Sequence, residues 1–132
     1  MKDIEPDVFD EFCAYMHTQY PTMDIRNEIL MTPETFPMVC LEEITNTIDR
    51  STIDSSHNEN YENVDYETRV YVHPVFGKRR EAKEIMSYAD SWFTNKGFER
   101  INSSFTFFND GTKAQCINQY QAKTDGNTIY RR

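Results

Sequence analysis

At 132 residues, the chain is long enough to bury one hydrophobic core and too short for two domains of ordinary size. Nine Phe and eight Tyr supply apolar side chains for that core. Acidic side chains outnumber basic ones by 22 to 14, which gives a net charge of −8 and a pI near 4.8. This balance argues against a duplex-binding module, whose basic stripe displaces counterions from phosphates, and it favours repulsion of nucleic acid.

The first element is predicted to be an amphipathic helix. Asp3 is placed to serve as its N-cap, and Pro6 falls in the first turn, where a missing N–H costs nothing. Pro21 ends the helix because the residue before a proline is pushed out of the α region. Apolar residues recur every four positions along one face, at Ile4, Val8, Phe12, Met16 and Tyr20.

Three strands are predicted next. A short strand is expected around Ile25 to Ile29, and a second one runs to Thr47. Its first part, residues 36–41, is apolar at every position, which is typical of a strand covered on both faces. The polar residues that follow predict a mobile loop at about residues 48–62. From Val64 to Val72, apolar and polar residues alternate, which predicts a strand with one buried face.

A second helix and a final hairpin complete the predicted order. Gly97 stands where the glycine of a Schellman-type helix end belongs, and Phe98 is placed for the hydrophobic contact of that motif. Strands at about residues 98–108 and 113–123 are joined through an Asp-Gly turn. The helix itself is indicated by apolar residues on one face, at Ala82, Ile85, Met86, Ala89 and Phe93.

These elements predict a single α+β domain covering residues 1–132. Two helices are expected to pack on one face of a mostly antiparallel sheet, in the order α-β-β-β-α-β-β.

Three cysteines, Cys13, Cys40 and Cys116, are widely separated, and none has a CxxC or other zinc-ligand spacing. They support neither a disulfide framework nor a structural metal, so reduced thiols in a cytoplasm are the plain interpretation. The first residues lack the apolar run of a signal peptide, and no apolar stretch is long enough to span a bilayer. We expect a protein assembled inside a cell, with no role for a membrane.

Few residues suggest chemistry. Cys13 and His17 lie one helical turn apart, which is half of a metal site at most, and Cys13 falls on the core face. Glu42 and Glu43 are adjacent on a predicted strand, so their side chains point to opposite faces and cannot form an acid–base dyad. The four glycines form neither a GxGxxG motif nor a Walker loop. We therefore expect no enzymatic activity, no cofactor and no metal.

Charged residues in three regions are candidates for a subunit or partner interface. One is the start of the second helix, where Lys78, Arg79 and Arg80 stand although the helix dipole favours anions there. The simpler interpretation is that these cations are solvated and compensated by Glu81 and Glu84. The other candidates are the two terminal arginines and the acidic side chains of the polar loop, Arg131, Arg132, Asp49, Asp54, Glu59 and Glu62.

Over its whole length, the chain resembles small prophage-encoded neck proteins of tailed phages from Gram-positive bacteria, the family of tail terminators and head–tail joining proteins. It departs from the family pattern at residues 101–104, which contain no proline, and in the aromatic-rich residues 105–108. The shared features follow the opening helix in the order Phe36-Pro37, Glu62-Asn63-Val64, Tyr66-Glu67, Val70-Tyr71, Gly77-Lys78, Glu81-Ala82-Lys83, Ile85, Gly97-Phe98, Arg100, Tyr120, Asp125 and Tyr130-Arg131-Arg132.

The resemblance implies a homo-oligomeric ring, typically a hexamer, located in the neck of the virion and assembled in the bacterial cytoplasm. Such a ring caps the tail tube, halts its polymerisation and offers a docking face to the connector of the head. The tail tube protein and the neck or connector proteins are then its partners. DNA passes through the lumen without specific binding, since the ring is strongly acidic.

Other functions stay open at this point. Within the virion, a neck adaptor or stopper and a minor capsid protein are alternatives, since all of these are small, acidic and oligomeric. A different class is a small enzyme that uses Cys13 and His17 or a carboxylate. A third class is a regulator that binds a host protein.

Overall fold

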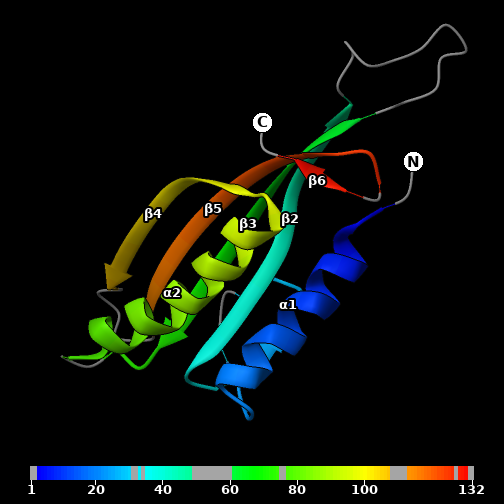
Figure 1. The fold of residues 1–132 in the computed structure, drawn as a ribbon. Helices are drawn as coiled ribbons and strands as arrows, with labels where there is room; N and C mark the ends of the chain where they lie inside the picture. Colours follow the sequence, from blue (N-terminus) through cyan, green and yellow to red (C-terminus); the bar gives the residue numbers. More distant parts are fainter. Residues whose placement is uncertain are drawn as a thin grey trace, which may run out of the picture.

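The computed structural model describes residues 3–30, 33, 35–48, 61–74, 77–107, 113–126 and 128–130. Two helices lie on one face of a six-stranded, mostly antiparallel sheet, so the predicted α+β fold and its order are confirmed (Figure 1). A short C-terminal strand is added to the predicted order. The elements are α1 (Glu5–Gln19), β1 (Asp24–Arg26), β2 (Met38–Ile48), β3 (Glu62–Val72), α2 (Lys78–Lys96), β4 (Glu99–Phe107), β5 (Ala114–Thr124) and β6 (Ile129–Tyr130).

The strand order β1-β2-β3-β5-β4 gives the sheet two different flanks. β1 pairs with β2 in parallel, and the other pairs are antiparallel. β4 forms one edge, while β6 pairs with the end of β5. In Figure 1, α2 crosses the middle of the sheet and α1 lies beside β2, at the flank opposite β4. The basic start of α2 and the acidic start of α1 are thereby placed at opposite ends of the molecule.

Helix α1 is close to its predicted form. The predicted N-cap is displaced by one residue, because Ile4 occupies the N-cap position. Asp3 still satisfies a backbone donor of the first turn, since its Oδ1 accepts a hydrogen bond from the Glu5 N–H at 3.0 Å. The helix ends at Gln19, ahead of Pro21, as predicted. Its core-facing side chains are Ile4, Val8, Phe12 and Met16, all buried.

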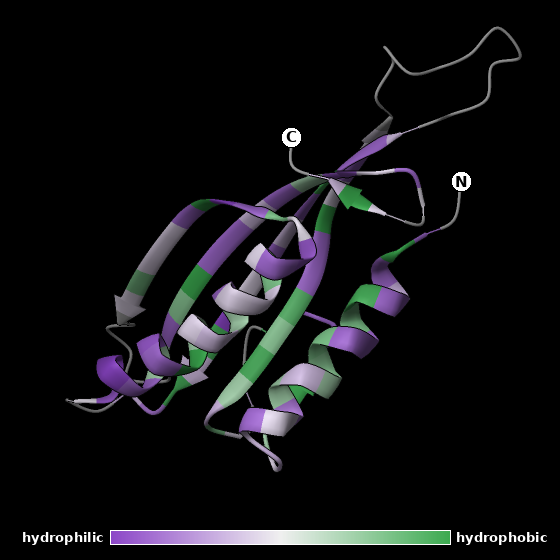
Figure 2. Ribbon diagram, viewed as in Figure 1, coloured by the Kyte–Doolittle hydropathy of each residue, from purple (hydrophilic) through white to green (hydrophobic). Residues whose placement is uncertain are grey.

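The start of β2 is buried on both faces, as predicted, and a different cluster of side chains packs against each face. One face belongs to the main core under the helices, where Figure 2 shows apolar residues on β2 and on the adjoining side of α1. The other face carries Met38 and Cys40, which pack with Tyr71 of β3. Ile29, Leu30 and Phe36 cover this smaller cluster from the connection between β1 and β2.

The predicted strand around Ile25 to Ile29 is shorter than expected and comprises only Asp24–Arg26. The chain leaves the sheet edge at Asn27, whose Nδ2 donates to the Leu41 carbonyl at 2.9 Å. The Ile29 N–H then donates to Glu42 Oε2 at 3.2 Å rather than to a strand carbonyl. These side-chain hydrogen bonds take the place of backbone pairing between strands, and the chain continues across the face of the sheet.

The predicted polar loop at residues 48–62 is also shorter, because Ile48 and Glu62 are paired strand residues. Residues 49–60, with Asp49, Asp54 and Glu59, lie outside the described residues, as does the predicted Asp-Gly turn. Glu62 is only 9% exposed, and its Oε2 accepts a hydrogen bond from Asn46 Nδ2 at 2.6 Å.

Helix α2 ends in the predicted Schellman motif. Gly97 has φ +103°, and its N–H donates to the Thr94 carbonyl at 3.2 Å. The Phe98 N–H donates to the Phe93 carbonyl at 3.0 Å, and the two rings pack at 5.1 Å between centroids. The ring of Phe93 also stacks on Tyr120 of β5, with centroids 4.0 Å apart, so the helix end is anchored in the core.

Two β-bulges place isoleucines on the face of the sheet that the helices do not cover. The pairing shifts between Glu43 and Thr45 in β2, and between Arg100 and Asn102 in β4. The extra residues, Ile44 and Ile101, are 47% and 51% exposed and line one shallow pocket together.

Candidate functional site

The three basic residues predicted as an interface, Lys78, Arg79 and Arg80, take different positions in the first turn of α2. Lys78 Nζ forms an ion pair with Glu81 Oε2 at 3.1 Å, as the simpler interpretation of these charges expected. The Arg79 guanidinium lies over the Phe105 ring of β4, 5.2 Å from its centroid. Arg80 is exposed and lies about 100° further around the helix axis than Arg79. Of the three, only Arg79 therefore faces β4.

A recess of about 310 Å³ lies between α2, β4 and β5. Arg79 lies near it, and the recess itself brings together residues that the sequence analysis did not connect. Lys83 follows Arg79 by one helical turn, and Arg100 of β4 lies across the recess. Arg100 Nη1 is 3.6 Å from Oδ1 of Asp90, the one carboxylate among the lining residues. The recess is lined by Lys83, Met86, Ser87, Asp90, Ser91, Arg100, Ser103, Cys116 and Asn118.

A chain of hydrogen bonds holds the side of this recess toward the core. The Tyr120 hydroxyl donates to Asp90 Oδ1 at 2.8 Å, and Asn118 Nδ2 donates to that hydroxyl at 2.9 Å. Burial raises the pKa of Tyr120, so the hydroxyl stays protonated and donates its one hydrogen bond to the Asp90 carboxylate. The orientation of the Asn118 amide follows from this, because its NH₂ group must face Tyr120.

The Oδ1 atom of Asn118 is consequently left as a buried acceptor. The residue is 1% exposed, and Oδ1 has no hydrogen-bond partner among the residues that the structure describes. An unsatisfied buried acceptor costs about 1–3 kcal/mol, so such groups normally find a partner. The side of the recess toward the core therefore contains a buried acceptor whose hydrogen bonding is incomplete among the described residues.

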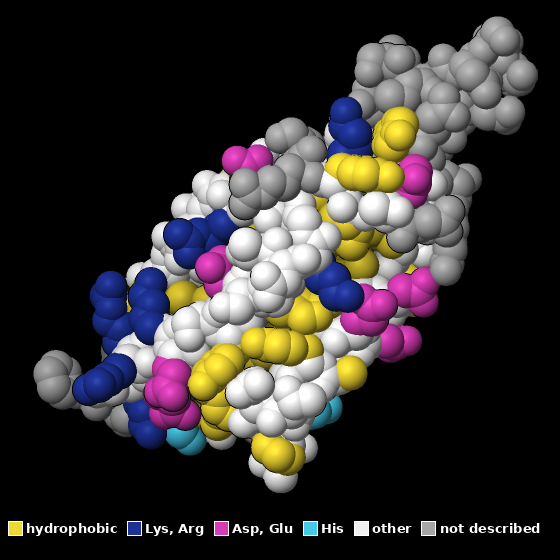
Figure 3. All heavy atoms as spheres, viewed as in Figure 1, with side chains coloured by type: hydrophobic (Ala, Val, Ile, Leu, Met, Phe, Trp, Pro, Cys, Tyr) yellow, Lys and Arg dark blue, Asp and Glu magenta, His cyan; other side chains and the backbone are white. Residues whose placement is uncertain are grey.

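The opposite flank of the molecule carries carboxylates. Asp7, Asp10 and Glu11 lie on the exposed face of α1, within one turn of each other. Glu11 Oε2 pairs with Lys96 Nζ of α2 at 2.8 Å. Figure 3 shows Asp and Glu side chains along the flank of α1, and Lys and Arg side chains along the flank where α2 begins and β4 lies. Despite the net charge of −8, basic side chains outnumber the interspersed Glu81 and Glu84 where α2 begins, whereas carboxylates predominate on α1.

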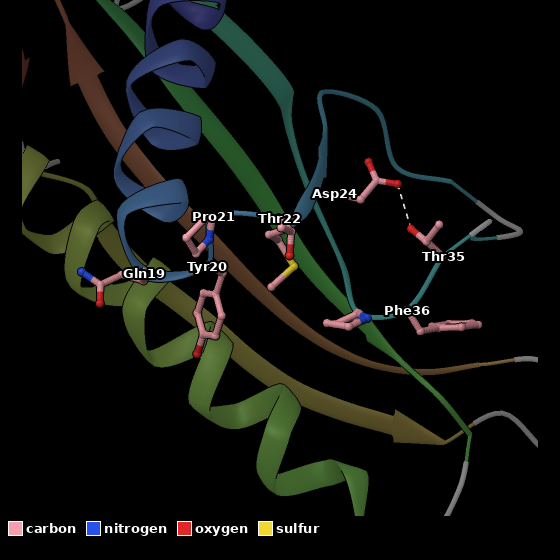
Figure 4. Close-up of a pocket in the computed structure, with 9 residues that line it drawn as sticks. Gln19, Tyr20, Pro21, Thr22, Asp24, Thr35 and Phe36 are labelled. Carbon is pink, nitrogen blue, oxygen red and sulfur yellow. Dashed lines mark hydrogen bonds between the residues drawn. The ribbon is translucent and has the colours of Figure 1, made fainter.

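A pocket of about 410 Å³ lies where α1 leads into β1. Figure 4 shows Tyr20 and Pro21 on one side of it, with Asp24, Thr35 and Phe36 on the other. The Asp24 carboxylate accepts hydrogen bonds from Arg26 at 2.7 and 3.1 Å and from Thr35 at 2.8 Å. These bonds, that of Arg26 first, hold its pKa below the ordinary value. The carboxylate acts as a clamp between β1 and the segment that precedes β2.

Cys13 and His17 were considered above as metal ligands or as a nucleophile and its base, and the structure gives each of them a different environment. Burial, together with the nearby Asp10 carboxylate, raises the pKa of Cys13 from 9.0 to about 11. The thiol is therefore protonated near neutral pH and is a weak nucleophile. His17 Nε2 hydrogen-bonds to the Met23 carbonyl at 2.9 Å. In the part of the chain that the structure describes, no three histidine, cysteine or carboxylate side chains gather in a metal-binding arrangement.

Glu42 and Glu43 lie on opposite faces of β2, as predicted. Glu42 accepts the hydrogen bond from Ile29 on the face away from the helices. Glu43 lies on the helix side, where its backbone N–H donates to Glu5 Oε2 at 2.8 Å. Burial raises the pKa of Glu43 to about 7, with further contributions from the carboxylates of Glu5 and Asp3. The side chain thus titrates near neutral pH at the contact between α1 and the sheet.

We expect Glu43→Gln to stabilise the protein above neutral pH. Because the folded pKa is raised above 4.5, the contribution of Glu43 to stability is complete below pH 4.5 and is lost as pH rises through about 7. At pH 8 the neutral glutamine should raise the free energy of unfolding by about 1–2 kcal/mol, after discounting the shift for partial solvent exposure. Urea unfolding at pH 4 and pH 8 measures this difference. The prediction is wrong if the gain is equal at both pH values, or if Glu42→Gln on the opposite face reproduces it.

The fold and the charge distribution define a two-layer α+β protein with carboxylates on α1 and an excess of basic side chains where α2 begins. No protein-family model and no curated protein sequence matches the chain. Neither helix of the described residues has the length and apolar character needed to cross a membrane.

Proposed function

We propose that this protein is a ring-forming structural subunit of a tailed-phage particle, a tail terminator that caps the tail tube and joins it to the head connector. The observation that carries the proposal is the opposite charge of the two flanks of the sheet. Association of identical subunits through two different surfaces needs two complementary patches on one chain, and opposite charge is one way to supply them. A contact of this kind produces a ring when the rotation between neighbours closes.

The sequence resemblance supports a tail terminator over other kinds of ring. The shared features begin in α1, continue through β2, β3 and α2, and end at the C-terminal Tyr130-Arg131-Arg132. Arg131 and Arg132, which we also assign to an interface, lie outside the described residues. β6, directly before them, is held against β5 through the pairs Lys123–Tyr130 and Thr124–Ile129.

In this role the protein acts by shape and contact, without a chemical step. One face of the ring reproduces the contact that tail-tube subunits make with each other, and the other face lacks it, so polymerisation stops. That second face then receives the connector. DNA passes through the lumen without specific binding, because six copies of a chain with net charge −8 repel phosphates.

The test combines mass measurement with binding to tail tubes. The purified protein is analysed by light scattering and native mass spectrometry, alone and with tail tubes of the phage that encodes it. We expect a six-copy species and, by electron microscopy, one additional ring at a single end of each tube. A chain that stays monomeric and never associates with tube ends contradicts the proposal. Binding to purified connectors but not to tubes would instead assign the protein as a neck adaptor or stopper.

A further inference from the structure

Strand β4 leaves one long edge of the sheet open. It is the last strand in the order β1-β2-β3-β5-β4 and pairs with β5, and no strand among the described residues pairs with its outer side (Figure 1). β1, at the opposite edge, comprises only Asp24–Arg26. The outward N–H and C=O groups of an edge strand are a template for another strand, so β4 is the edge on which a further chain can pair over several residues.

The sequence of β4 does not protect this edge against such pairing. Charged side chains, proline and bulges commonly do so in edge strands. From Ile101 to Phe107 the strand contains neither a charged residue nor a proline. Its bulge lies near the beginning, between Arg100 and Asn102, and residues 102–107 pair with β5 without interruption. This stretch is as long as an ordinary strand.

Cations stand along one face of the edge. Phe105 points toward α2, because the Arg79 guanidinium lies over its ring. Ser103 and Arg100 point to the same side, since both line the recess between β4 and α2 together with Lys83. Arg79, Lys83 and Arg100 are exposed. A strand that pairs with β4 therefore comes within reach of three positive charges.

Carboxylates offset only part of this charge. Asp90 Oδ1 lies 3.6 Å from Arg100 Nη1. Glu84 and Glu81 are on the side of α2 toward Tyr20, whose pKa is raised by burial first and also by these two carboxylates. The side of α2 that faces β4 is thus left with an excess of positive charge.

The other face of the edge is uncharged over residues 101–107. Ile101 lies there and lines a pocket with Ile44 of β2. Ser104 and Thr106 share this face, because they alternate with the residues that point toward α2. A strand added beside β4 alternates in the same way. Acidic side chains suit its face near α2, and apolar or β-branched side chains suit its other face.

The edges of a second copy of this chain do not supply such a strand. Antiparallel pairing of β4 with β4 of another copy, about a two-fold axis, would place the α2 cations of both copies on one side of the joined sheet, where like charges repel. β1 of another copy can pair over three residues at most. Charge and length therefore favour a different chain.

We infer that β4 is the docking edge for an extended segment of a partner protein, in which acidic residues alternate with apolar or β-branched ones. Backbone hydrogen bonds supply the affinity and the alternating side chains supply the specificity, as in other cases of strand addition. The inference goes beyond the proposed ring and does not depend on it. Because the cations are exposed, binding should weaken as the salt concentration rises.

A synthetic peptide tests the site directly. Its ends are blocked, and glutamate alternates with valine and threonine over about eight residues. Calorimetric titration measures its binding, and hydrogen exchange locates the contact. We expect amide exchange to slow at residues 102–107 and to stay unchanged in β1 and α1. A peptide of the same composition with its glutamates grouped together should bind about tenfold more weakly or worse, because it cannot place them all on one face.

N-methylation separates strand pairing from general attraction. Two further peptides carry N-methyl groups on the odd-numbered or on the even-numbered amides, since a strand uses alternate amides toward one neighbour. One of them should lose binding and the other should keep it. Equal binding of the two contradicts pairing with β4.

Variants of the protein test the charges. Arg79→Glu combined with Lys83→Glu should weaken binding about tenfold or more, and a peptide with lysine in place of glutamate should prefer this variant to the unaltered protein. Arg80→Glu, on the outward side of α2, is the matched control and should bind as the unaltered protein does. Circular dichroism and the urea midpoint report whether each variant folds. If the double variant does not fold, Lys83→Glu alone replaces it, because Lys83 is exposed.

Three results would overturn the inference. The first is that the alternating peptide does not bind, or slows exchange in a strand other than β4. The second is that Arg80→Glu weakens binding as strongly as the double variant. The third is protection of β4 that grows with protein concentration in the absence of peptide, which would show that a second copy occupies the edge. The ring is judged separately, by mass measurement with tail tubes.

Discussion

Phe93→Ala is expected to lower the free energy of unfolding by about 3–5 kcal/mol, as is usual for a fully buried aromatic residue. The Phe93 ring is completely buried and lies at the centre of an aromatic cluster. It stacks on Tyr120 at 4.0 Å and meets Phe98 and Trp92 at 5.1 Å each. Its removal leaves a cavity between α2 and β5 and loosens the helix end that Phe98 anchors. Urea unfolding followed by far-UV and near-UV circular dichroism measures the loss.

Phe9→Ala is the matched control, because this phenylalanine is only partly buried against the same core. We expect it to cost less than about 2 kcal/mol, since part of the ring is already in water. Equal losses for the two variants would contradict the assignment of Phe93 to the centre of the core. The loss for Phe93 is a large fraction of the stability of a small domain, so a substantial part of this variant should be unfolded under mild denaturing conditions.

Gly97→Ala is expected to cost about 2–5 kcal/mol, through two separate effects. The backbone at Gly97 has φ +103°, a conformation that costs an L-residue about 1–2 kcal/mol. A Cβ there would also lie 2.8 Å from the Ile129 carbonyl oxygen, so β6 must move away. Overpacking of this kind costs about 1–3 kcal/mol. Amide hydrogen exchange at residues 128–130 should therefore increase along with the loss of stability.

Gly77→Ala separates these two effects. Gly77 also has a positive φ, +94°, but a Cβ at this position meets no atom within 4 Å. We expect only the conformational cost of about 1–2 kcal/mol and no change in exchange at residues 128–130. A Gly97 variant no less stable than the Gly77 variant would show that β6 does not pack on the end of α2.

Several parts of the fold could be predicted because their signals are local. The stripe from Ile4 to Met16 and the Gly97-Phe98 helix end depend on residues within a few positions of each other. The alternation from Val64 to Val72 likewise indicates a strand whatever its neighbours are. Each of these predictions is confirmed within a residue or two.

The errors arose where distant residues compete for backbone groups. β1 stops at Arg26 because Asn27 bonds to Leu41, 14 positions away, and no local pattern announces that contact. The bulges at Ile44 and Ile101 depend on the pairing register of neighbouring strands, which a single strand does not contain. Glu62 also depends on strand pairing. The sequence analysis places it in a loop, but it pairs with β2 and β5 as the first residue of β3 and is buried.

The recess between α2 and β4 could be predicted only in part from the sequence. Arg79 and Arg80 are neighbours in the sequence, but the helix turns only Arg79 toward β4. The recess also needs Lys83 and Arg100, which the sequence analysis did not associate with it. An excess of acidic residues was evident from composition, whereas their separation from the basic flank was not.

The amino-acid sequence by itself determined the types and order of the main elements and which side of each helix is apolar, since hydrophobic spacing and capping act over a few residues. The tertiary structure alone decided that β5 enters the sheet between β3 and β4. This insertion leaves β4 at the edge beside α2 and puts α1 at the far flank. The order depends on hydrogen bonds between strands up to 62 positions apart, as in the pair Glu62–Thr124, and on the burial of one face of β5 along its whole length. For that reason, the opposed charged flanks arise only when the sheet is assembled.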